Sequence, residues 1–410
     1  MSNAAFLTRV VVKNYKSIAA CDVDLRQLTI LVGPNGAGKS NFLDALRFVA
    51  DGLRTSLDHA FRERGGIGEV RRRSGGHPNH FGARLEFALP NGAAGSYGFR
   101  IGAKPNGAFE VQSEECVLRP PEALAGESRF TVTAGEVSST DPGPAAASDR
   151  LYLVSASGLP EFRPVYDSLS NMGFYNLSTE RIRDLQLPDA GELLARDGGN
   201  LAAVLDLIGK RRPELKARIE EYLARVAPGI QGVDAIALGP RETLQFRQEA
   251  AGGDAPWRFL AANMSDGTLR ALGVLVALFQ TGPAPLVGLE EPEAGLHPAA
   301  VGVLVDAMFA AGDTRQVLVT SHSPDLLDSS RLETDSILAV VAEAGSTYVG
   351  PLDAVGREAL RKRLYSAGEL LRLDQLRPER LTKAEAPSSQ LRLLGEDSPD
   401  SDPLGEDPRA

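Results

Sequence analysis

Residues 33–40 read Gly-Pro-Asn-Gly-Ala-Gly-Lys-Ser, which is the complete Gly-x-x-x-x-Gly-Lys-Ser pattern of a phosphate-binding loop. An apolar run at 28–32 precedes the loop, and Phe42, Leu46 and Val49 follow it at helical spacing. In this strand, loop, helix context the backbone N–H groups and the positive end of the helix face the same anion. The pattern therefore predicts a nucleoside triphosphate site.

The side chains of the loop have distinct expected roles. Lys39 reaches the β and γ oxygens of the nucleotide, and the Ser40 hydroxyl ligates Mg²⁺. The glycines let the backbone turn its N–H groups inward around the phosphate. The predicted nucleotide-binding residues of this segment are Gly33, Asn35, Gly36, Gly38, Lys39, Ser40 and Asn41.

Two adjacent acids follow a second apolar run far downstream. Residues 285–289 are apolar and end in Glu290 and Glu291. In a chain with a phosphate loop, acids at a strand end are expected beside the γ-phosphate. Glu290 would then hold Mg²⁺ through water, and Glu291 would orient or deprotonate the attacking water as the catalytic base.

Two further elements fit the same chemistry. His322 follows the apolar run 316–320 and is expected to contact a γ-phosphate oxygen or the attacking water. Ser265 and Gly267 begin a nearly all-apolar helix over 269–279, where Ser265 is a good N-cap. Ser265, the Gly267 N–H and the helix dipole also form an anion cradle. If this cradle lies far from the loop within one subunit, it would serve the ATP of a second subunit.

The periodicity of the chain predicts the elements that position these residues. Short strands lead into the loop, and alternation at 84–89, 97–101 and 109–111 predicts an antiparallel meander. Helical spacing between 166 and 226 predicts a compact helical insertion. Alternating strand and helix patterns between 269 and 320 predict a mostly parallel sheet with crossover helices. The fold class is therefore α/β.

We expect four regions along the chain. They are an N-terminal lobe with the phosphate loop and antiparallel strands (1–110), an elaborated loop and helical insertion (111–260), a C-terminal lobe (261–377), and an acidic tail (378–410). The segment 120–148 is rich in Gly, Pro, Ala and Ser and is predicted to be a surface loop. The tail repeats the tetrad Leu-Gly-Glu-Asp at 394–397 and 404–407 and is predicted to be disordered.

Composition narrows the class of protein. The 410 residues are 43% hydrophobic, enough for a sizeable core, and no apolar run approaches the roughly 18 residues of a membrane span. Cys21 and Cys116 lie far apart, so no disulfide framework or zinc site is indicated, and we expect a cytoplasmic protein without membrane contact. The net charge of −10 argues against indiscriminate coating of nucleic acid. Three basic clusters, 62–73, 210–218 and 361–363, are either solvated faces or nucleic-acid contacts.

The ordered motifs resemble ABC-type ATPases of the RecF/SMC-like branch, which includes the OLD-family ATPase domains. The resemblance is carried by residues 33–40, 265–267, 290–292, 294–297 and 321–323, with 14–18 as the short strand and turn before the loop. It implies a P-loop NTPase fold of ABC type with ATP and Mg²⁺ as cofactors. It also implies a head-to-head dimer in which each ATP lies between the loop of one subunit and Ser265 and Gly267 of the other.

The resemblance assigns the remaining roles. Glu290 corresponds to the Walker B acid, Glu291 to the catalytic base, and His322 to the switch histidine. The chain departs from the common pattern by carrying Glu290 in place of aspartate and Asp266 in place of glycine. Asp266 would add negative charge near a phosphate and slow dimer closure. The insertion is too short for SMC coiled coils, and the residues after His322 are too few for an appended TOPRIM nuclease domain, so we expect a stand-alone ATPase.

Three functions remain open at this point. The first is an ATP-driven switch acting on DNA in repair, recombination or anti-phage defence, with a separately encoded nuclease or toxin as effector. The second is a regulatory module in which slow hydrolysis times the holding of a protein effector without DNA contact. The third, less favoured, is the ATPase subunit of a membrane transporter.

Overall fold

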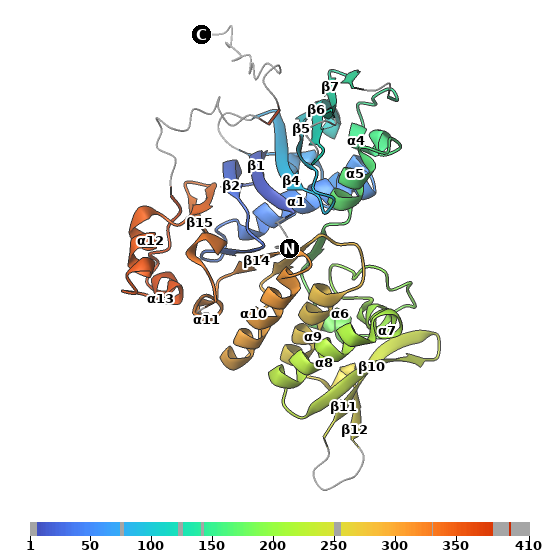
Figure 1. Cartoon of the computed structure of the whole chain (residues 1–410), viewed down its shortest axis with the longest axis vertical. Coiled ribbons are helices and arrows are strands. Elements are labelled where there is room, and N and C mark those ends of the chain that lie inside the picture. Colours follow the sequence, from blue (N-terminus) through green and yellow to red (C-terminus); the bar gives the residue numbers. More distant parts are fainter. Residues whose placement is uncertain are drawn as a thin grey trace.

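The computed structural model describes residues 6–73, 78–121, 126–140, 143–249, 256–329, 331–379 and 393–394. Most strands join one mixed 13-stranded sheet, and three others form a small separate sheet (Figure 1). In spatial order the large sheet contains β8 (Glu136–Ser139), β7 (Ser128–Thr133), β6 (Phe109–Arg119), β5 (Ala94–Ala103), β4 (His80–Ala88), β1 (Leu7–Tyr15), β2 (Ile18–Asp24), β16 (Ser346–Pro351), β15 (Ile337–Glu343), β3 (Leu28–Val32), β14 (Gln316–Ser321), β13 (Leu286–Glu290) and β9 (Gly173–Tyr175).

The sheet has an antiparallel and a parallel part. From β8 to β2 neighbouring strands run antiparallel, whereas β9, β13, β14, β3 and β15 run parallel. The sheet separates two hydrophobic cores, and successive residues of β3 face opposite ones. Leu31 lies in the first core, and Ile30 and Val32 lie in the second. A strand buried on both faces needs a continuous apolar run, which explains the sequence pattern at 28–32. The mixed α/β architecture is thus confirmed.

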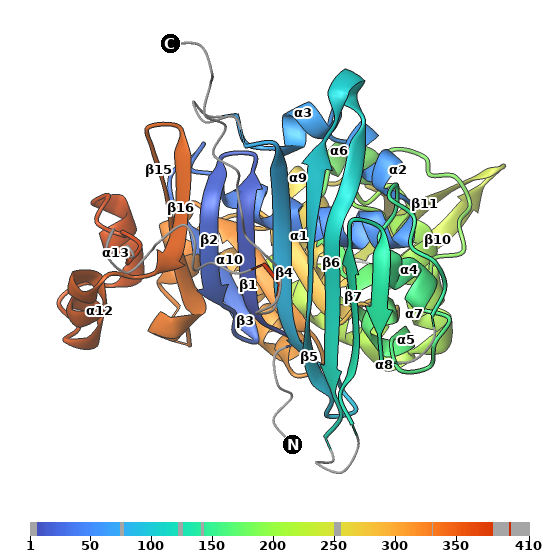
Figure 2. The ribbon, with the colours of Figure 1, turned by 90° about the horizontal axis from the view of Figure 1, so that it is seen from above.

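Helices pack on both faces of the parallel strands, since alternate residues of β3 lie in two different cores. Figure 2 looks onto the antiparallel strands and shows helices behind them. One core lies between the antiparallel strands and α1 (Lys39–Arg54), α2 (Leu57–Arg62), α3 (Ile67–Val70), α4 (Tyr152–Ala156) and α5 (Arg163–Ser170). The other core lies under α6 (Thr179–Arg183), α7 (Leu201–Arg211), α8 (Pro213–Val226), α9 (Asp266–Phe279), α10 (Pro298–Gly312), α11 (Pro324–Leu327) and α13 (Ala367–Arg372), with α12 (Ala354–Arg361) at its edge.

The region of the predicted helical insertion contains helices and also a small antiparallel sheet. β10 (Ile230–Leu238), β11 (Arg241–Gln248) and β12 (Trp257–Leu260) pair in that order, and α7 and α8 pack against β10. None of the described helices has the length and apolar character needed to span a bilayer.

Two expectations about the first half of the chain need correction. The predicted surface loop at 120–148 contains the hairpin β7–β8; the sequence shows only a weak strand signal at 129–132, within β7, because Gly and Pro residues surround these short strands. The predicted boundary between 110 and 111 falls inside β6, and the first core continues to Phe174. The N-terminal lobe therefore extends well beyond residue 110.

Most of the predicted disordered tail, 380–392 and 395–410, lies outside the described residues. Four of its residues are described, and Pro378, Leu393 and Leu394 are buried whereas Glu379 is exposed. Leu393 and Leu394 pack on Val11 of β1, so the tail contacts the sheet at that point.

Glu114 on β6 is a carboxyl group buried within the first core. It accepts hydrogen bonds from the Tyr97 hydroxyl and from the backbone N–H groups of Tyr152 and Leu153. Burial raises the pKa of Glu114 to about 7, although these hydrogen bonds oppose the shift. The loop that leads into α4 is therefore anchored on an acid that titrates near neutrality.

This burial predicts a pH-dependent stability. Because the folded pKa of Glu114 is raised, its contribution is fully present below about pH 4 and is lost as pH rises through 7. We expect this group alone to lower the free energy of unfolding by roughly 3 kcal/mol between pH 4 and 8. Urea titrations across this range should show a flatter profile for Glu114→Gln than for wild type. If the free energy of unfolding changed with pH in the same way in both proteins, the assignment of this pH dependence to Glu114 would be contradicted.

Candidate nucleotide site

The phosphate loop leaves β3 at its carboxyl end and leads directly into α1. Gly36 and Gly38 have φ angles of 76° and 100°, in the left-handed region that glycine adopts without strain. The Lys39 ammonium donates to the carbonyl oxygens of Gly33 (2.7 Å) and Pro34 (3.0 Å). The lysine thus lies within the curve of the loop backbone, while Ser40 at the start of the helix is exposed.

Polar side chains from other strands hold the loop in place. The Asn41 amide donates to the Ser17 hydroxyl (2.6 Å), which is 2.7 Å from the Thr347 hydroxyl. Thr347 in turn donates to the Ala37 carbonyl (2.9 Å). A Cβ on Gly38 would lie 2.1 Å from the Thr347 hydroxyl oxygen, so this brace requires glycine there. The sequence analysis assigned no role in the site to Ser17 or Thr347. The predicted nucleotide-binding residue Asn41 donates its side-chain hydrogen bond to this brace.

The carboxyl ends of β13, β14 and β3 meet at one edge of the sheet because these neighbouring strands run parallel. Glu291 directly follows β13 with φ 44°, and its backbone N–H donates to the Thr320 carbonyl (3.0 Å). The Glu291 carboxylate lies 3.3 Å from Nδ1 of His322, which follows β14. Both side chains are about two-fifths exposed (40% and 43%), so a water molecule has access to the pair.

Lys39 lies in the electrostatic field of two carboxylates. Burial lowers the pKa of Lys39, and the charges of Glu291 and Glu293 oppose that shift. Glu293 is 6% exposed, and its pKa is raised by burial. It accepts a hydrogen bond from the Ser321 hydroxyl, while its second oxygen has no hydrogen-bond partner among the described residues.

Glu293 is a site residue that sequence reasoning missed. The available signal was the spacing Glu-Glu-Pro-Glu at 290–293, which places a third acid one turn beyond the strand end. A buried carboxyl group with an unpaired oxygen beside Lys39 is suited to hold a proton or a water molecule next to the phosphate loop.

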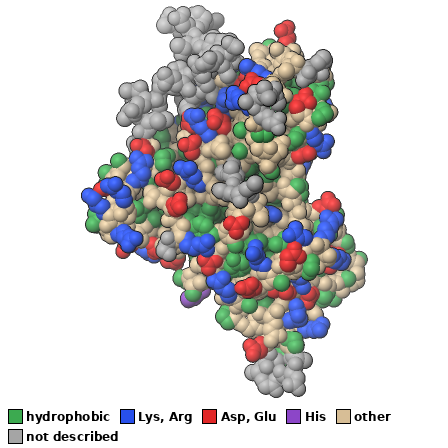
Figure 3. Space-filling model, viewed as in Figure 1, with side chains coloured by type: hydrophobic (Ala, Val, Ile, Leu, Met, Phe, Trp, Pro, Cys, Tyr) green, Lys and Arg blue, Asp and Glu red, His purple; other side chains and the backbone are tan. Residues whose placement is uncertain are grey.

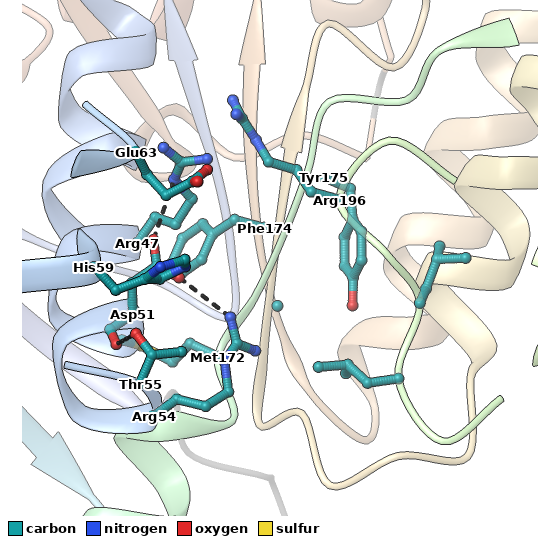
Figure 4. Close-up of a pocket in the computed structure, with 13 residues that line it drawn as sticks. Arg47, Asp51, Arg54, Thr55, His59, Glu63, Met172, Phe174, Tyr175 and Arg196 are labelled. Carbon is teal, nitrogen blue, oxygen red and sulfur yellow. Dashed lines mark hydrogen bonds and ion pairs between the residues drawn. The ribbon is translucent and has the colours of Figure 1, made fainter. Parts of the chain in front are cut away.

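Glu290 at the end of β13 is paired with a residue that sequence reasoning also missed. Its carboxylate accepts from the Arg196 guanidinium (2.9 Å), and Arg196 borders a cavity of about 230 Å³ between α1 and β9 (Figure 4). On the α1 and α2 side this cavity is lined by Arg47, Asp51, Arg54, Thr55, His59 and Glu63. The predicted magnesium acid is therefore linked to this cavity through one side chain.

Ser265 and Gly267 lie at the start of α9, and no hydrogen bond among the described residues joins their side chains to the phosphate loop. The Ser265 hydroxyl caps its own helix by accepting from the Thr268 N–H (3.2 Å). A Cβ on Gly267 would lie 3.1 Å from the Gly295 carbonyl. Asp266 is paired with Arg183, which offsets the negative charge noted in the sequence. The structure brings together Lys39, Glu290, Glu291 and His322 but not Ser265 and Gly267.

The basic cluster 62–73 is largely structural. The Arg64 side chain is 1% exposed and pairs with Asp44 and Asp51 of α1, both at 3.0 Å. Burial alone would raise the pKa of Asp44, but Arg64, Lys16 and Arg47 hold it well below its usual range. Two exposed arginines of the cluster pair locally, Arg62 with Asp58 and Arg73 with Glu69.

The residues present fit magnesium carried by a nucleotide. Among the described residues, no group of three or more His, Cys, Asp or Glu side chains could hold a metal ion by itself. Ser40 and Glu290 supply only two oxygen donors. Mg²⁺ is commonly held by one or two carboxylates together with substrate phosphates and water, so this sparse donor set matches it.

Comparisons with known proteins agree with this geometry. Residues 28–328 match the family described as "AAA domain, putative AbiEii toxin, Type IV TA system". A stretch of 47 residues is 38% identical to the DNA replication and repair protein RecF of Vibrio campbellii, covering 11% of this chain and 13% of that protein.

Two solved structures have a similar fold. One is an Smc head bound to the C-winged helix domain of ScpA (TM-score 0.53, 16% identity, 87% of this chain and 99% of that one). The other is an Smc head with an extended coiled coil bound to the C-terminal domain of ScpA, derived from Pyrococcus furiosus (TM-score 0.54, 14% identity, 88% and 99%). The chain belongs to this AAA family, and it shares its fold with the Smc heads.

Proposed function

We propose that the chain binds ATP with Mg²⁺ at the phosphate loop and hydrolyses it to ADP and phosphate. The observation that carries this proposal is the convergence of three strand ends, where Lys39, Glu291 and His322 meet at one edge of the sheet. The bound metal would neutralise developing charge on the phosphates, and Ser40 and Glu290 would hold it.

The side chains of the site then have separate tasks. Lys39, now bonded to loop carbonyls, would exchange those partners for phosphate oxygens. Glu291 would take a proton from the attacking water, and His322 would orient that water or a phosphate oxygen. The nucleotide would also contact Gly33, Asn35, Gly36 and Gly38 through the loop backbone.

The site is completed by a second copy of the chain. Ser265 and Gly267 begin α9, whose N-terminal end is suited to an anion, yet Ser265 bonds only within its own helical turn among the described residues. An ATP-dependent homodimer would place this helix end against the γ-phosphate held by the partner. The head-like fold supports this arrangement.

The biological setting we favour is DNA repair, recombination or anti-phage defence, with a separately encoded effector protein. The RecF-like stretch and the family description support this choice. The alternative is a nucleotide-timed module that holds a protein effector without DNA. The buried and paired arginines of 62–73 favour the alternative, as does the mixture of basic and acidic side chains on the face in Figure 3.

ATP turnover with and without duplex and single-stranded DNA, at several salt concentrations, tests both settings. If DNA acts as a partner, it should raise turnover, and its binding should weaken steeply with salt. If DNA does not change ATP turnover at any salt concentration, the result would favour the module that holds a protein effector. Absence of ATP turnover under all conditions would contradict the proposed activity.

Arg196 should compete with Mg²⁺ for Glu290. Removing a partly exposed ion pair of this kind changes a binding free energy by about 0.2–1 kcal/mol, so Arg196→Ala should lower the Mg²⁺ concentration for half-maximal nucleotide binding by about 1.5- to 5-fold. Arg54→Ala is the matched control, since Arg54 lines the same cavity but pairs with Asp51. A higher Mg²⁺ requirement in Arg196→Ala would show that Arg196 supports the acid instead.

A further inference from the structure

One buried hydroxyl group holds the backbone on both sides of His322. The Ser321 hydroxyl donates a hydrogen bond to Glu293 and accepts one from the backbone N–H of Ser323 (2.9 Å). Ser321 is fully buried (0% exposed), and a hydroxyl group has a single hydrogen. Because Glu293 takes that hydrogen, the lone pairs of the hydroxyl are left to face the Ser323 N–H. The conformation of the segment that carries His322 is therefore tied to Glu293.

Glu293 belongs to the turn that follows β13, and hydrogen bonds fix that turn. The backbone N–H of Glu291 donates to the carbonyl of Thr320 (3.0 Å), the residue before Ser321. The backbone N–H of Ala294 donates to the carbonyl of Glu291 (3.1 Å) and closes the turn around Glu293. Two adjacent residues at the end of β14, Thr320 and Ser321, are thus bonded to two residues of the turn, Glu291 and Glu293.

Exposure separates two pairs of residues here. His322 and Glu291, whose side chains lie 3.3 Å apart, are 43% and 40% exposed. Glu293 and Ser321 beneath them are 6% and 0% exposed. The second oxygen of Glu293 is buried and has no hydrogen-bond partner among the described residues. A carboxyl group enclosed in this way acts through the side chain that it contacts, which is Ser321.

We propose that Glu293 is a positioning residue, which holds the His322 imidazole beside Glu291 through the Ser321 hydroxyl. Its effect on turnover rests on the proposed ATPase function, but its hold on the backbone does not. When Glu293 no longer takes the Ser321 hydrogen, the hydroxyl can rotate, and its bond to the Ser323 N–H weakens. His322 then loses its fixed distance from Glu291. A misplacement of about 1 Å near the reacting atoms costs about 10²-fold in rate.

Amide hydrogen exchange tests this hold without any nucleotide. Loss of one hydrogen bond should raise the exchange rate of the Ser323 N–H about 2- to 12-fold in Ser321→Ala, and at least about 2-fold in Glu293→Leu. Ser113→Ala removes a hydroxyl from a similarly buried serine of β6 (3% exposed) and should leave this rate unchanged. Unchanged exchange at Ser323 in Ser321→Ala would overturn the proposal, even if Glu293→Leu did not fold.

Turnover of the same variants separates positioning from direct chemistry. Glu293→Leu and Ser321→Ala should each lower kcat about 10- to 100-fold, while nucleotide affinity stays within about two-fold of wild type. Glu293→Gln keeps an acceptor oxygen for Ser321 but cannot take up a proton, so its kcat should stay within about three-fold of wild type. A loss in Glu293→Gln as large as that in Glu293→Leu would overturn the positioning role.

Removal of the positioned side chain provides the last test. In a His322→Ala background, Glu293→Leu should lower kcat by less than about two-fold further, because the side chain that it positions is gone. A full further loss there would show that Glu293 acts on the reaction by itself and would contradict the proposal. If wild type does not hydrolyse ATP, the proposed function fails, and exchange at Ser323 alone decides the role of Glu293.

Discussion

Glu291→Gln is expected to slow ATP turnover by at least about 100-fold, since a positioned general base contributes about 10²- to 10⁴-fold to such a reaction. Glutamine keeps the shape of the side chain but cannot accept the proton of the attacking water. The backbone N–H of residue 291 would still bond to Thr320, so the strand end should keep its geometry. Nucleotide affinity should therefore be unchanged.

Steady-state phosphate release and equilibrium nucleotide binding measure the two halves of this prediction. Glu333→Gln, an exposed glutamate outside the site, is the matched control and should behave as wild type. If Glu291→Gln keeps turnover within a few-fold of wild type, another group acts as the base. Glu293, buried beside Lys39, would then be the first candidate.

Arg64→Ala is expected to destabilise the fold by about 1.5–3 kcal/mol, because it removes the buried charged hydrogen bonds to Asp44 and Asp51. The loss is limited because Lys16, Arg47 and Arg54 still pair with these carboxylates. The Arg64 guanidinium also lies 5.3 Å from the centre of the Phe48 ring, a contact that is lost as well. The measurement is the free energy of unfolding from urea titration.

Two variants bracket this result. Arg64→Lys keeps the charge but loses the forked hydrogen bonds, so it should lie between wild type and Arg64→Ala. Arg62→Ala removes a 78% exposed side chain and should change stability by at most about 1 kcal/mol. If Arg64→Ala were as stable as Arg62→Ala, Arg64 would be free for a ligand, and the nucleic-acid interpretation of 62–73 would regain support.

Local sequence patterns predicted much of this fold. The apolar run at 28–32 and the fixed positions of the phosphate loop identified β3, the loop and α1. The helical spacing predicted between 166 and 226 includes α8, in which Pro213 occupies the first helical position and Leu215, Ile219 and Leu223 lie along one stripe.

The missed features depend on contacts between distant segments. Asp44 and Asp51 stand on one face of α1, but nothing local shows that Arg64 folds back onto them and is buried. The pairing of Arg196 with Glu290 likewise joins residues that are 94 positions apart. Sequence periodicity reports which face of an element is buried, but it does not identify the partner across that face.

The proposal that two copies of the chain complete each ATP site is tested most directly by the mass of Glu291→Gln in solution with ATP and Mg²⁺. Slow hydrolysis should trap a dimer that disappears without nucleotide. Ser265→Arg, introduced into the same background, should bind ATP normally but remain monomeric, because the substituted helix end could not approach the partner's nucleotide. A Glu291→Gln chain that stays monomeric while saturated with ATP would contradict the shared site.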